Sequence, residues 1–220
     1  MPDTNRLRDD FSHVSHWVFD LDHTLYPPEM ALFDQIEIRM SAWVQDILKV
    51  SAAEADHLRR HYWEKYGTTL AGLMREHNVD PERYLIDVHD ISFDHMTIDH
   101  DLVSHIKALP GRRIVYTNGS EPYARNVLAA RGLSECFDAV YGVEHADFHP
   151  KPERQAFDKV FGLDGVDGKI GAMFEDDARN LAVPHALGMQ CVHVAPEHEP
   201  ADHIHHHTDD LTAFLSQLTA

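Results

Sequence analysis

The sequence predicts an α/β protein with a parallel sheet and a helical insertion after the first strand. Over the second part of the chain, short apolar runs alternate with segments of helical periodicity, which is typical of strands joined by crossover helices. Between the first two apolar runs lies a long segment whose apolar residues recur at helical spacing instead. With 220 residues, 43% of them hydrophobic, the chain is long enough for one sizeable core, or for one core with a smaller satellite.

The first predicted strand covers residues 15–19, a mostly apolar run that ends in an acidic loop. Such runs are typical of buried parallel strands that carry functional groups at their carboxyl ends. The later strands are predicted at residues 113–116, 139–141, 170–174 and 190–194. Helices are predicted between and after them, at residues 122–131, 152–161, 178–187 and 209–218.

Residues 29–91 do not follow that alternation and are predicted to be helical. Ser51 fits the N-cap of a helix that runs to Tyr66, and shorter helices are expected from Thr68 and from Asp80. We therefore expect an inserted helical unit between the first and second strands, after which residues 91–98 return the chain to the sheet.

The amino-terminal segment is rich in charged and polar residues, and residues 1–13 are expected to form a flexible tail. The segment lacks the apolar stretch of a signal peptide, and no run approaches the roughly 18 to 20 apolar residues of a membrane span. We therefore expect a cytoplasmic protein without membrane partners. Cys136 and Cys191 have no CxxC spacing and are interpreted as core residues.

The charge balance is strongly acidic, with 19 Lys+Arg against 37 Asp+Glu and a formal net charge of -18. This balance argues against nucleic-acid polymers and anionic membrane surfaces as partners. A small anionic substrate is compatible with it if a metal ion or a few cationic side chains offset the acidic field.

Four polar loops each follow or adjoin an apolar run. Because ligands bind at the carboxyl ends of parallel strands, these loops are expected to meet in one site. Taken singly they have ordinary structural explanations, since Asn-Gly is a common turn dipeptide and acidic residues favour helix amino termini. The loops are Asp20-Leu21-Asp22-His23-Thr24, Thr117-Asn118-Gly119, His149-Pro150-Lys151-Pro152 and Glu175-Asp176-Asp177.

In this order, the four loops resemble the motifs of the haloacid dehalogenase superfamily, over nearly the whole chain from about Val14 to Leu218. Residues 19–27, with the second and fourth loops, look most like the pyrimidine 5′-nucleotidase branch. The resemblance implies a doubly wound, Rossmann-like parallel sheet with a helical cap domain inserted after the first strand. It implies a core domain of residues 1–26 and 99–220 and a cap domain of residues 27–98.

The resemblance also implies a phosphomonoesterase that acts on a small nucleotide-like substrate through an aspartyl-phosphate. Asp20 would be the nucleophile. Asp22 would be the general acid for the leaving alcohol and then the general base for water. Lys151 would offset negative charge on the nucleophile and the transferring group.

Magnesium is the implied cofactor, because a phosphate monoester placed beside an acidic cluster requires a cation that prefers oxygen ligands. The implied ligands are the Asp20 side chain, the Asp22 backbone carbonyl and Asp176, with Glu175 and Asp177 nearby or in contact with the metal. The implied phosphate-binding residues are Thr117, Asn118 and Gly119, with Thr24 orienting the first loop.

Other functions share parts of this pattern. A haloacid dehalogenase uses the same nucleophile against carbon, but a halide leaving group needs no acid, so Asp22 argues against it. A phosphoglucomutase-type enzyme shares the aspartate pair and stays open. A receiver-like module or an inactive phosphate-binding relative is the non-enzyme alternative; residues 29–91 do not fit the compact receiver.

Several aromatic and histidine residues fall outside these motifs. Tyr26 directly follows the first loop and is expected close to the mouth of the site. Residues 203–205 alternate as in a short edge strand before a helix cap at 208–210, and a transition-metal site is the alternative. The aromatic residues of the insertion are expected mainly in its core, with stacking on a nucleobase as the alternative; they are Trp43, Tyr62, Trp63, Tyr66 and Tyr84.

Overall fold

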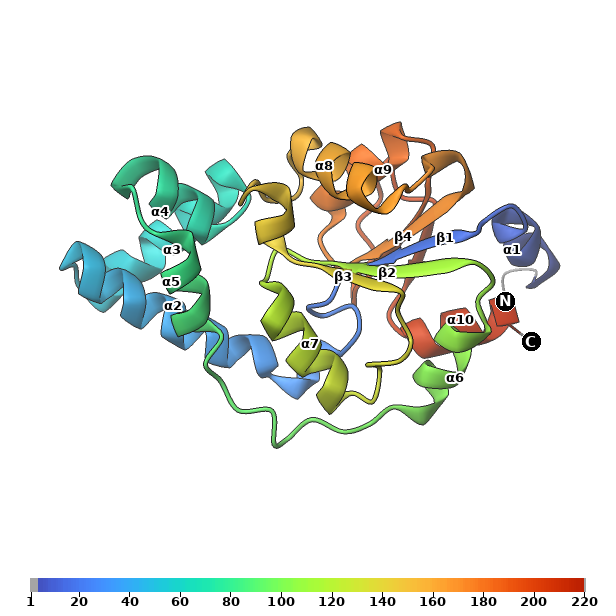
Figure 1. Cartoon of the computed structure of the whole chain (residues 1–220), viewed down its shortest axis with the longest axis horizontal. Coiled ribbons are helices and arrows are strands. Elements are labelled where there is room, and N and C mark those ends of the chain that lie inside the picture. Colours follow the sequence, from blue (N-terminus) through green and yellow to red (C-terminus); the bar gives the residue numbers. More distant parts are fainter. Residues whose placement is uncertain (1–3, 220) are drawn as a thin grey trace.

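The computed structural model describes residues 4–219, and in that part of the chain six parallel strands form one sheet (Figure 1). The strand order is β3-β2-β1-β4-β5-β6, so β1 lies in the interior of the sheet between β2 and β4. This confirms the predicted doubly wound parallel sheet. The strands are β1 (His16–Phe19), β2 (Arg112–Tyr116), β3 (Ala139–Tyr141), β4 (Gly171–Glu175), β5 (Gln190–Val194) and β6 (His206–Thr208).

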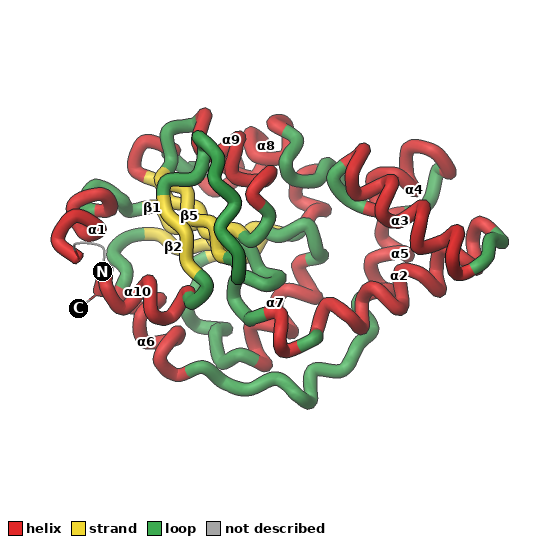
Figure 2. The backbone as a smooth tube through the Cα atoms, turned by 180° about the vertical axis from the view of Figure 1, so that it is seen from behind, coloured by secondary structure: helices red, strands yellow, loops and turns green. Residues whose placement is uncertain are grey.

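Helices cover both faces of the sheet, as the views from the front and from behind show (Figures 1 and 2). Side chains alternate along a strand, so Trp17 and Phe19 of β1 join the core on one face while Val18 joins the core on the other. The first face packs against α6 (His100–Ala108), α7 (Glu121–Ala130) and α10 (Leu211–Thr219), and the second against α8 (Arg154–Asp164) and α9 (Ala182–Ala186).

The inserted segment between β1 and β2 is helical, as predicted, and its helices group at one end of the sheet (Figure 1). Each of the last three begins at a side-chain cap, because Ser51, Thr68 and Asp80 accept hydrogen bonds from backbone N–H groups of the first turn. We propose that residues 27–98 form a cap domain on a core of residues 1–26 and 99–220. The helices are α2 (Leu32–Leu48), α3 (Ala52–Tyr66), α4 (Thr69–His77) and α5 (Pro81–Val88).

The expectation of a flexible tail over residues 1–13 is wrong for residues 4–13, while residues 1–3 lie outside the described part. Residues Thr4–Phe11 form helix α1. Its side chains Leu7 and Phe11, one helical turn apart, are only 7% and 5% exposed. The Phe11 ring stacks on Trp17 of β1 at a centroid distance of 6.0 Å. Two apolar residues at i, i+4 in a polar segment thus suffice to dock the helix on the core.

Two expected boundaries differ from the structure. The helix expected at 178–187 begins as a 3₁₀ turn, and α9 starts only at Ala182. Pro184 has no N–H group to donate and therefore fits the first turn of α9. The edge strand expected at 203–205 lies at β6 instead, because His203 and His205 hydrogen-bond the backbone of Ala178 and Cys191.

The expected core positions are confirmed for the cysteines and for two of the aromatic residues of the insertion. Both cysteines are buried and unpaired. In the insertion, Tyr62 and Tyr84 are core residues, whereas Trp63 is 47% exposed. Among the described residues, the longest helices fall short of the length and apolar character that a membrane crossing needs.

We predict that Phe11→Ala lowers the free energy of unfolding by about 3 kcal/mol, because it removes a buried ring that packs on the sheet. Urea denaturation followed by circular dichroism measures this change. Arg6→Ala, at an exposed position of the same helix, is the control and should change stability by less than about 0.5 kcal/mol. Equal stabilities of the two variants would show that α1 is not docked in solution.

Candidate active site

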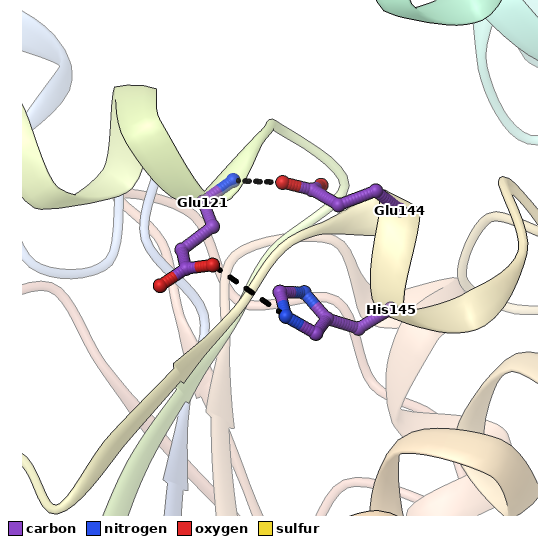
Figure 3. Close-up of side chains that lie close together, drawn as sticks. All are labelled: Glu121, Glu144 and His145. Carbon is purple, nitrogen blue, oxygen red and sulfur yellow. Dashed lines mark hydrogen bonds and ion pairs between the residues drawn. The ribbon is translucent and has the colours of Figure 1, made fainter.

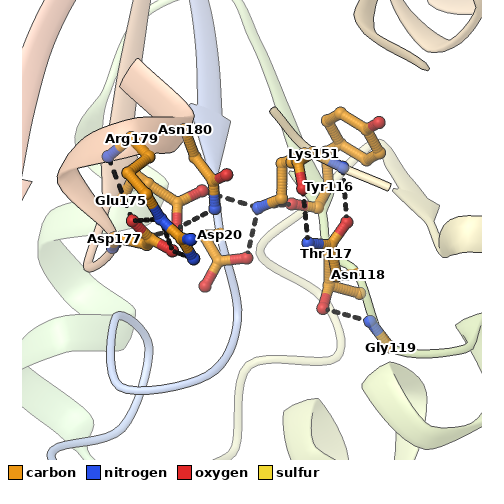
Figure 4. Close-up of polar contacts among 10 residues, drawn as sticks. All are labelled: Asp20, Tyr116, Thr117, Asn118, Gly119, Lys151, Glu175, Asp177, Arg179 and Asn180. Carbon is orange, nitrogen blue, oxygen red and sulfur yellow. Dashed lines mark hydrogen bonds and ion pairs between the residues drawn. The ribbon is translucent and has the colours of Figure 1, made fainter. Parts of the chain in front are cut away.

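Three of the four predicted loops meet because they follow adjacent strands. Asp20 directly follows β1, Thr117 follows β2 and Glu175 ends β4, and β1 pairs with both neighbours. The fourth loop brings Lys151 in from the segment before α8 (Figure 4). The parallel sheet therefore gathers side chains that lie more than 150 residues apart in the sequence.

The Lys151 ammonium group is the centre of this arrangement. Its Nζ donates to Asp20 Oδ1 and to Glu175 Oε2, both at 2.6 Å, and to the Tyr116 carbonyl at 3.1 Å (Figure 4). These three bonds use all of its donors. Lys151 and Glu175 are each 1% exposed, and Asp20 is 5% exposed. A buried cation thus holds two buried carboxylates side by side.

The backbone around Lys151 is fixed by Asn118. The Asn118 side chain accepts from Lys151 N at 2.8 Å and donates to the Lys151 carbonyl at 3.2 Å. The side-chain amide predicted to bind phosphate is therefore committed to the Lys151 loop. Thr117 Oγ1 accepts from Gly119 N at 2.9 Å and closes the turn between them. These bonds occupy the Asn118 side chain but not its backbone N–H, which is therefore the group of Asn118 that could donate to a phosphate.

A group of carboxylates suits a divalent cation. Asp20, Glu175 and Asp176 each offer an oxygen, and these oxygens lie within 4.8 Å of one another. Oxygen ligands of this kind are the ones that Mg²⁺ prefers. Asp177, predicted as a further acid, turns away and pairs with Arg179, which leaves it outside this group. Of the predicted ligands, the side chains of Asp20 and Asp176 lie together, and Glu175 joins them as a third carboxylate that fits Mg²⁺. The Asp22 backbone carbonyl stays a predicted ligand.

Burial sets the protonation of these groups. It raises the pKa of Asp20 to about 7, in spite of the opposing charge of Lys151. It also raises the pKa of Glu175, helped by the nearby Asp20. Burial disfavours the charged form of Lys151, but Asp20 and Glu175 outweigh this effect and raise its pKa. A bound cation would favour the ionised form of both carboxylates.

Asp22 lies in a different environment from Asp20. Its Oδ1 accepts from Tyr26 OH and from Tyr123 OH, both at 2.5 Å. Burial raises the pKa of Asp22, and the two tyrosine hydrogen bonds oppose this rise. Tyr26 was expected close to the mouth of the site. It does contact a residue of the site, but its side chain is buried. Thr24 is also buried, and its hydroxyl has no partner among the described residues.

The structure adds contacts that the sequence did not indicate. Asn180 donates to Glu175 Oε1 at 3.1 Å. His23 Nδ1 lies 3.4 Å from Asp176 Oδ2; burial opposes its protonation, but Asp176 outweighs this and raises the pKa of His23. Tyr123 donates a hydrogen bond to Asp22, which lies 101 residues earlier in the sequence. No local sequence pattern could reveal that contact. Asn180 lies only five residues after Glu175, in the 3₁₀ turn that follows β4.

A cavity of about 700 Å³ connects the carboxylates to the insertion. Its inner end is lined by Asp20, Asp22 and Lys151, and its outer part by side chains of α2, α3, α4 and α5. The outer lining combines apolar and aromatic side chains with two arginines and two acidic residues, and includes Phe33, Met40, Leu70, Tyr84, Val88, Arg59, Arg60, Asp34 and Glu37.

A second group of metal-ligand side chains, Glu121, Glu144 and His145, has structural partners instead (Figure 3). Glu144 Oε1 accepts from the backbone N–H of Glu121 at 2.7 Å, at the amino terminus of α7. His145 Nδ1 accepts from Gly142 N at 3.1 Å. This group therefore fixes the start of α7, directly after the Thr117–Gly119 turn.

We predict that Lys151→Met lowers the free energy of unfolding by about 3 kcal/mol at about pH 8, because two buried carboxylates lose their cation. The loss should shrink toward about pH 5. Asp20 and Glu175 have raised pKa values in the folded protein, so they favour folding while they are protonated. This contribution to the free energy of unfolding is lost as the pH rises from about 4 to 7 or above, when both groups become charged and depend on the cation.

Urea denaturation in EDTA at both pH values measures this change. The control is Lys159→Met, which removes a partly exposed ion pair with Asp147 and should cost less than about 1 kcal/mol. A loss for Lys151→Met that does not depend on pH would contradict this electrostatic explanation.

The fold is similar to those of several solved structures. The HAD-hydrolase YfnB from Bacillus subtilis, bound to magnesium, is 15% identical with a TM-score of 0.61, over 94% of this chain and 99% of that one. CbbY from Rhodobacter sphaeroides, in complex with phosphate, is 16% identical with a TM-score of 0.61, over 92% and 99%. L-2-haloacid dehalogenase from Xanthobacter autotrophicus, with chloropropionic acid covalently bound, is 17% identical with a TM-score of 0.54, over 84% and 79%.

At these identities the likeness shows the fold alone. The family model of the haloacid dehalogenase-like hydrolases matches residues 15–188, a range that contains all four predicted loops. This chain therefore belongs to the haloacid dehalogenase-like hydrolase family.

Proposed function

We propose that this chain is a magnesium-dependent phosphomonoesterase that acts through an aspartyl-phosphate on Asp20, with pyrimidine nucleoside 5′-monophosphates as its substrates. The observation that carries the proposal is the contrast between the two aspartates. Asp20 is bound by a lysine within a group of carboxylates, whereas Asp22 is bound by two tyrosine hydroxyls. Two carboxyl groups in such different environments suit a nucleophile and a separate acid–base group.

The proposed first step transfers the phosphoryl group to the enzyme. An Asp20 carboxylate oxygen forms a bond to phosphorus while the bond from phosphorus to the ester oxygen breaks. Asp22 gives its proton to that oxygen, so the leaving group departs as an alcohol. In the second step water attacks phosphorus, Asp22 takes the proton of the water, and the bond to Asp20 breaks to release phosphate.

The predicted Mg²⁺ fits Asp20, Glu175 and Asp176, whose oxygens lie close together. When bound, the metal would neutralise negative charge on the phosphate and on these carboxylates. Lys151 contributes a fixed positive charge beside Asp20. The backbone N–H of Asn118 is our proposed donor to a phosphate oxygen, because the Asn118 side chain is occupied by Lys151.

The size and lining of the cavity support a substrate larger than a haloacid. A cavity of about 700 Å³ lies within the range of drug-sized ligand sites. The apolar and aromatic side chains of its outer part suit a planar base, and this agrees with the sequence likeness to pyrimidine 5′-nucleotidases. Asp22 provides the proton that a phosphate ester needs and a halide does not.

We predict that Asp20→Asn abolishes magnesium-dependent hydrolysis of p-nitrophenyl phosphate, because the amide cannot form the aspartyl-phosphate. Asp22→Asn should lower kcat by about 100-fold or more while inorganic phosphate still inhibits competitively. Continuous release of p-nitrophenolate measures both. Metal-independent turnover at the wild-type rate by Asp20→Asn would contradict the mechanism.

We also predict that, among UMP, CMP, dTMP, purine monophosphates, sugar phosphates and 2-haloacids, the pyrimidine monophosphates have the highest kcat/KM. Release of inorganic phosphate or halide measures turnover. Equal activity on nucleotides and sugar phosphates would contradict the assignment of pyrimidine nucleotides as substrates. The more general proposal, that the protein is a phosphomonoesterase, would still hold. Halide release without phosphate release would favour the dehalogenase instead.

A further inference from the structure

We propose that Tyr26 and Tyr123 are positioning residues that orient the Asp22 carboxyl group, so that Oδ2 faces the leaving group. The inference rests on the proposed phosphomonoesterase function. This proposal gives a function to two buried tyrosines, and one of them, Tyr123, lies outside all four predicted loops.

The first argument is the geometry at Asp22. Both hydroxyl groups donate to the same oxygen, Oδ1, at 2.5 Å. A carboxyl oxygen has two lone-pair directions, and these two donors fill both of them. While both hydroxyl groups donate to Oδ1, a proton on the Asp22 carboxyl group resides on Oδ2. Oδ2 is accordingly the atom from which a proton can pass to an ester oxygen.

The second argument is that the tyrosine side chains are held in place. Each is 1% exposed. The ring of His89 stacks on Tyr123 at a centroid distance of 4.3 Å and an interplanar angle of 6°, and His89 Nδ1 lies 3.1 Å from Ser120 Oγ. The backbone at Gly119 also packs closely against this ring, since a Cβ added there would lie 2.9 Å from Tyr123 Cδ1. The Tyr123 hydroxyl therefore has little freedom to leave Asp22.

The third argument is where the two tyrosines come from. Tyr26 follows the loop that carries Asp20, and Tyr123 lies in the first turn of α7, after the Thr117–Gly119 turn. The Asp22 carboxyl group is thus tied to the nucleophile loop and to the proposed phosphate-binding turn at once. Hydrogen bonds from buried, fixed donors orient a reacting group without reorganisation during the reaction.

The test compares two esters of similar shape. The phenolate from phenyl phosphate is a stronger base than that from p-nitrophenyl phosphate, so its departure depends more on proton transfer. We expect Tyr26→Phe and Tyr123→Phe each to lower kcat/KM for phenyl phosphate about tenfold or more and for p-nitrophenyl phosphate less than about threefold. Inhibition by inorganic phosphate should change less than about twofold.

The matched control is Tyr141→Phe, which removes a tyrosine hydrogen bond to another aspartate, Asp164 Oδ1, at 2.8 Å and away from the cavity. It should leave the ratio of the two kcat/KM values unchanged. Either tyrosine variant that folds, as judged by circular dichroism, suffices for the comparison.

Equal losses on both esters, or no loss on phenyl phosphate, would overturn the positioning role. If the wild-type protein with Mg²⁺ hydrolyses neither ester, the phosphomonoesterase proposal itself fails. The two failures are therefore distinguished by the wild-type measurement alone.

Discussion

The rest of the site depends on one buried ammonium group, that of Lys151. It compensates the charge of Asp20 and Glu175, two carboxylates that are almost completely buried. The loop that carries it is fixed by Asn118 on one side. On the other side it touches the insertion, since a Cβ at Gly67 would lie 2.9 Å from the Lys151 carbonyl. Core and insertion therefore meet at the residue that pairs with Asp20.

Against this background, the two aspartates of the first loop differ by their partners rather than by their type. Asp20 is held by a cation and shares its surroundings with other carboxylates, so it suits metal binding and attack on phosphorus. Asp22 is held by neutral hydroxyl donors, which suits the acid–base role that we propose for it. They are two residues apart in sequence, and their different partners include Lys151 and Tyr123, each more than 100 positions away. This difference in partners is what supports the opposite tasks that we propose for them.

Local patterns predicted much of this fold. The strands and the helix caps at Ser51, Thr68 and Asp80 were predictable because burial and capping leave marks within a few residues. Docking of α1 was not, because Leu7 and Phe11 are too few to form a clear periodic pattern. The polar loops predicted where the site lies. The contacts of Tyr123 with Asp22 and of Asn118 with Lys151 were beyond reach, since both join segments that only the sheet brings together.

The proposed covalent step can be tested directly by acid quench of the Asp22→Asn variant during turnover of p-nitrophenyl phosphate with Mg²⁺, followed by peptide mass spectrometry. This ester needs little help from an acid, whereas hydrolysis of the intermediate needs a base, so the phosphoryl-enzyme should accumulate. We expect one phosphoryl group, on the peptide and side chain of Asp20. Phosphate release without any covalent adduct, or an adduct on a residue other than Asp20, would contradict the proposed chemistry.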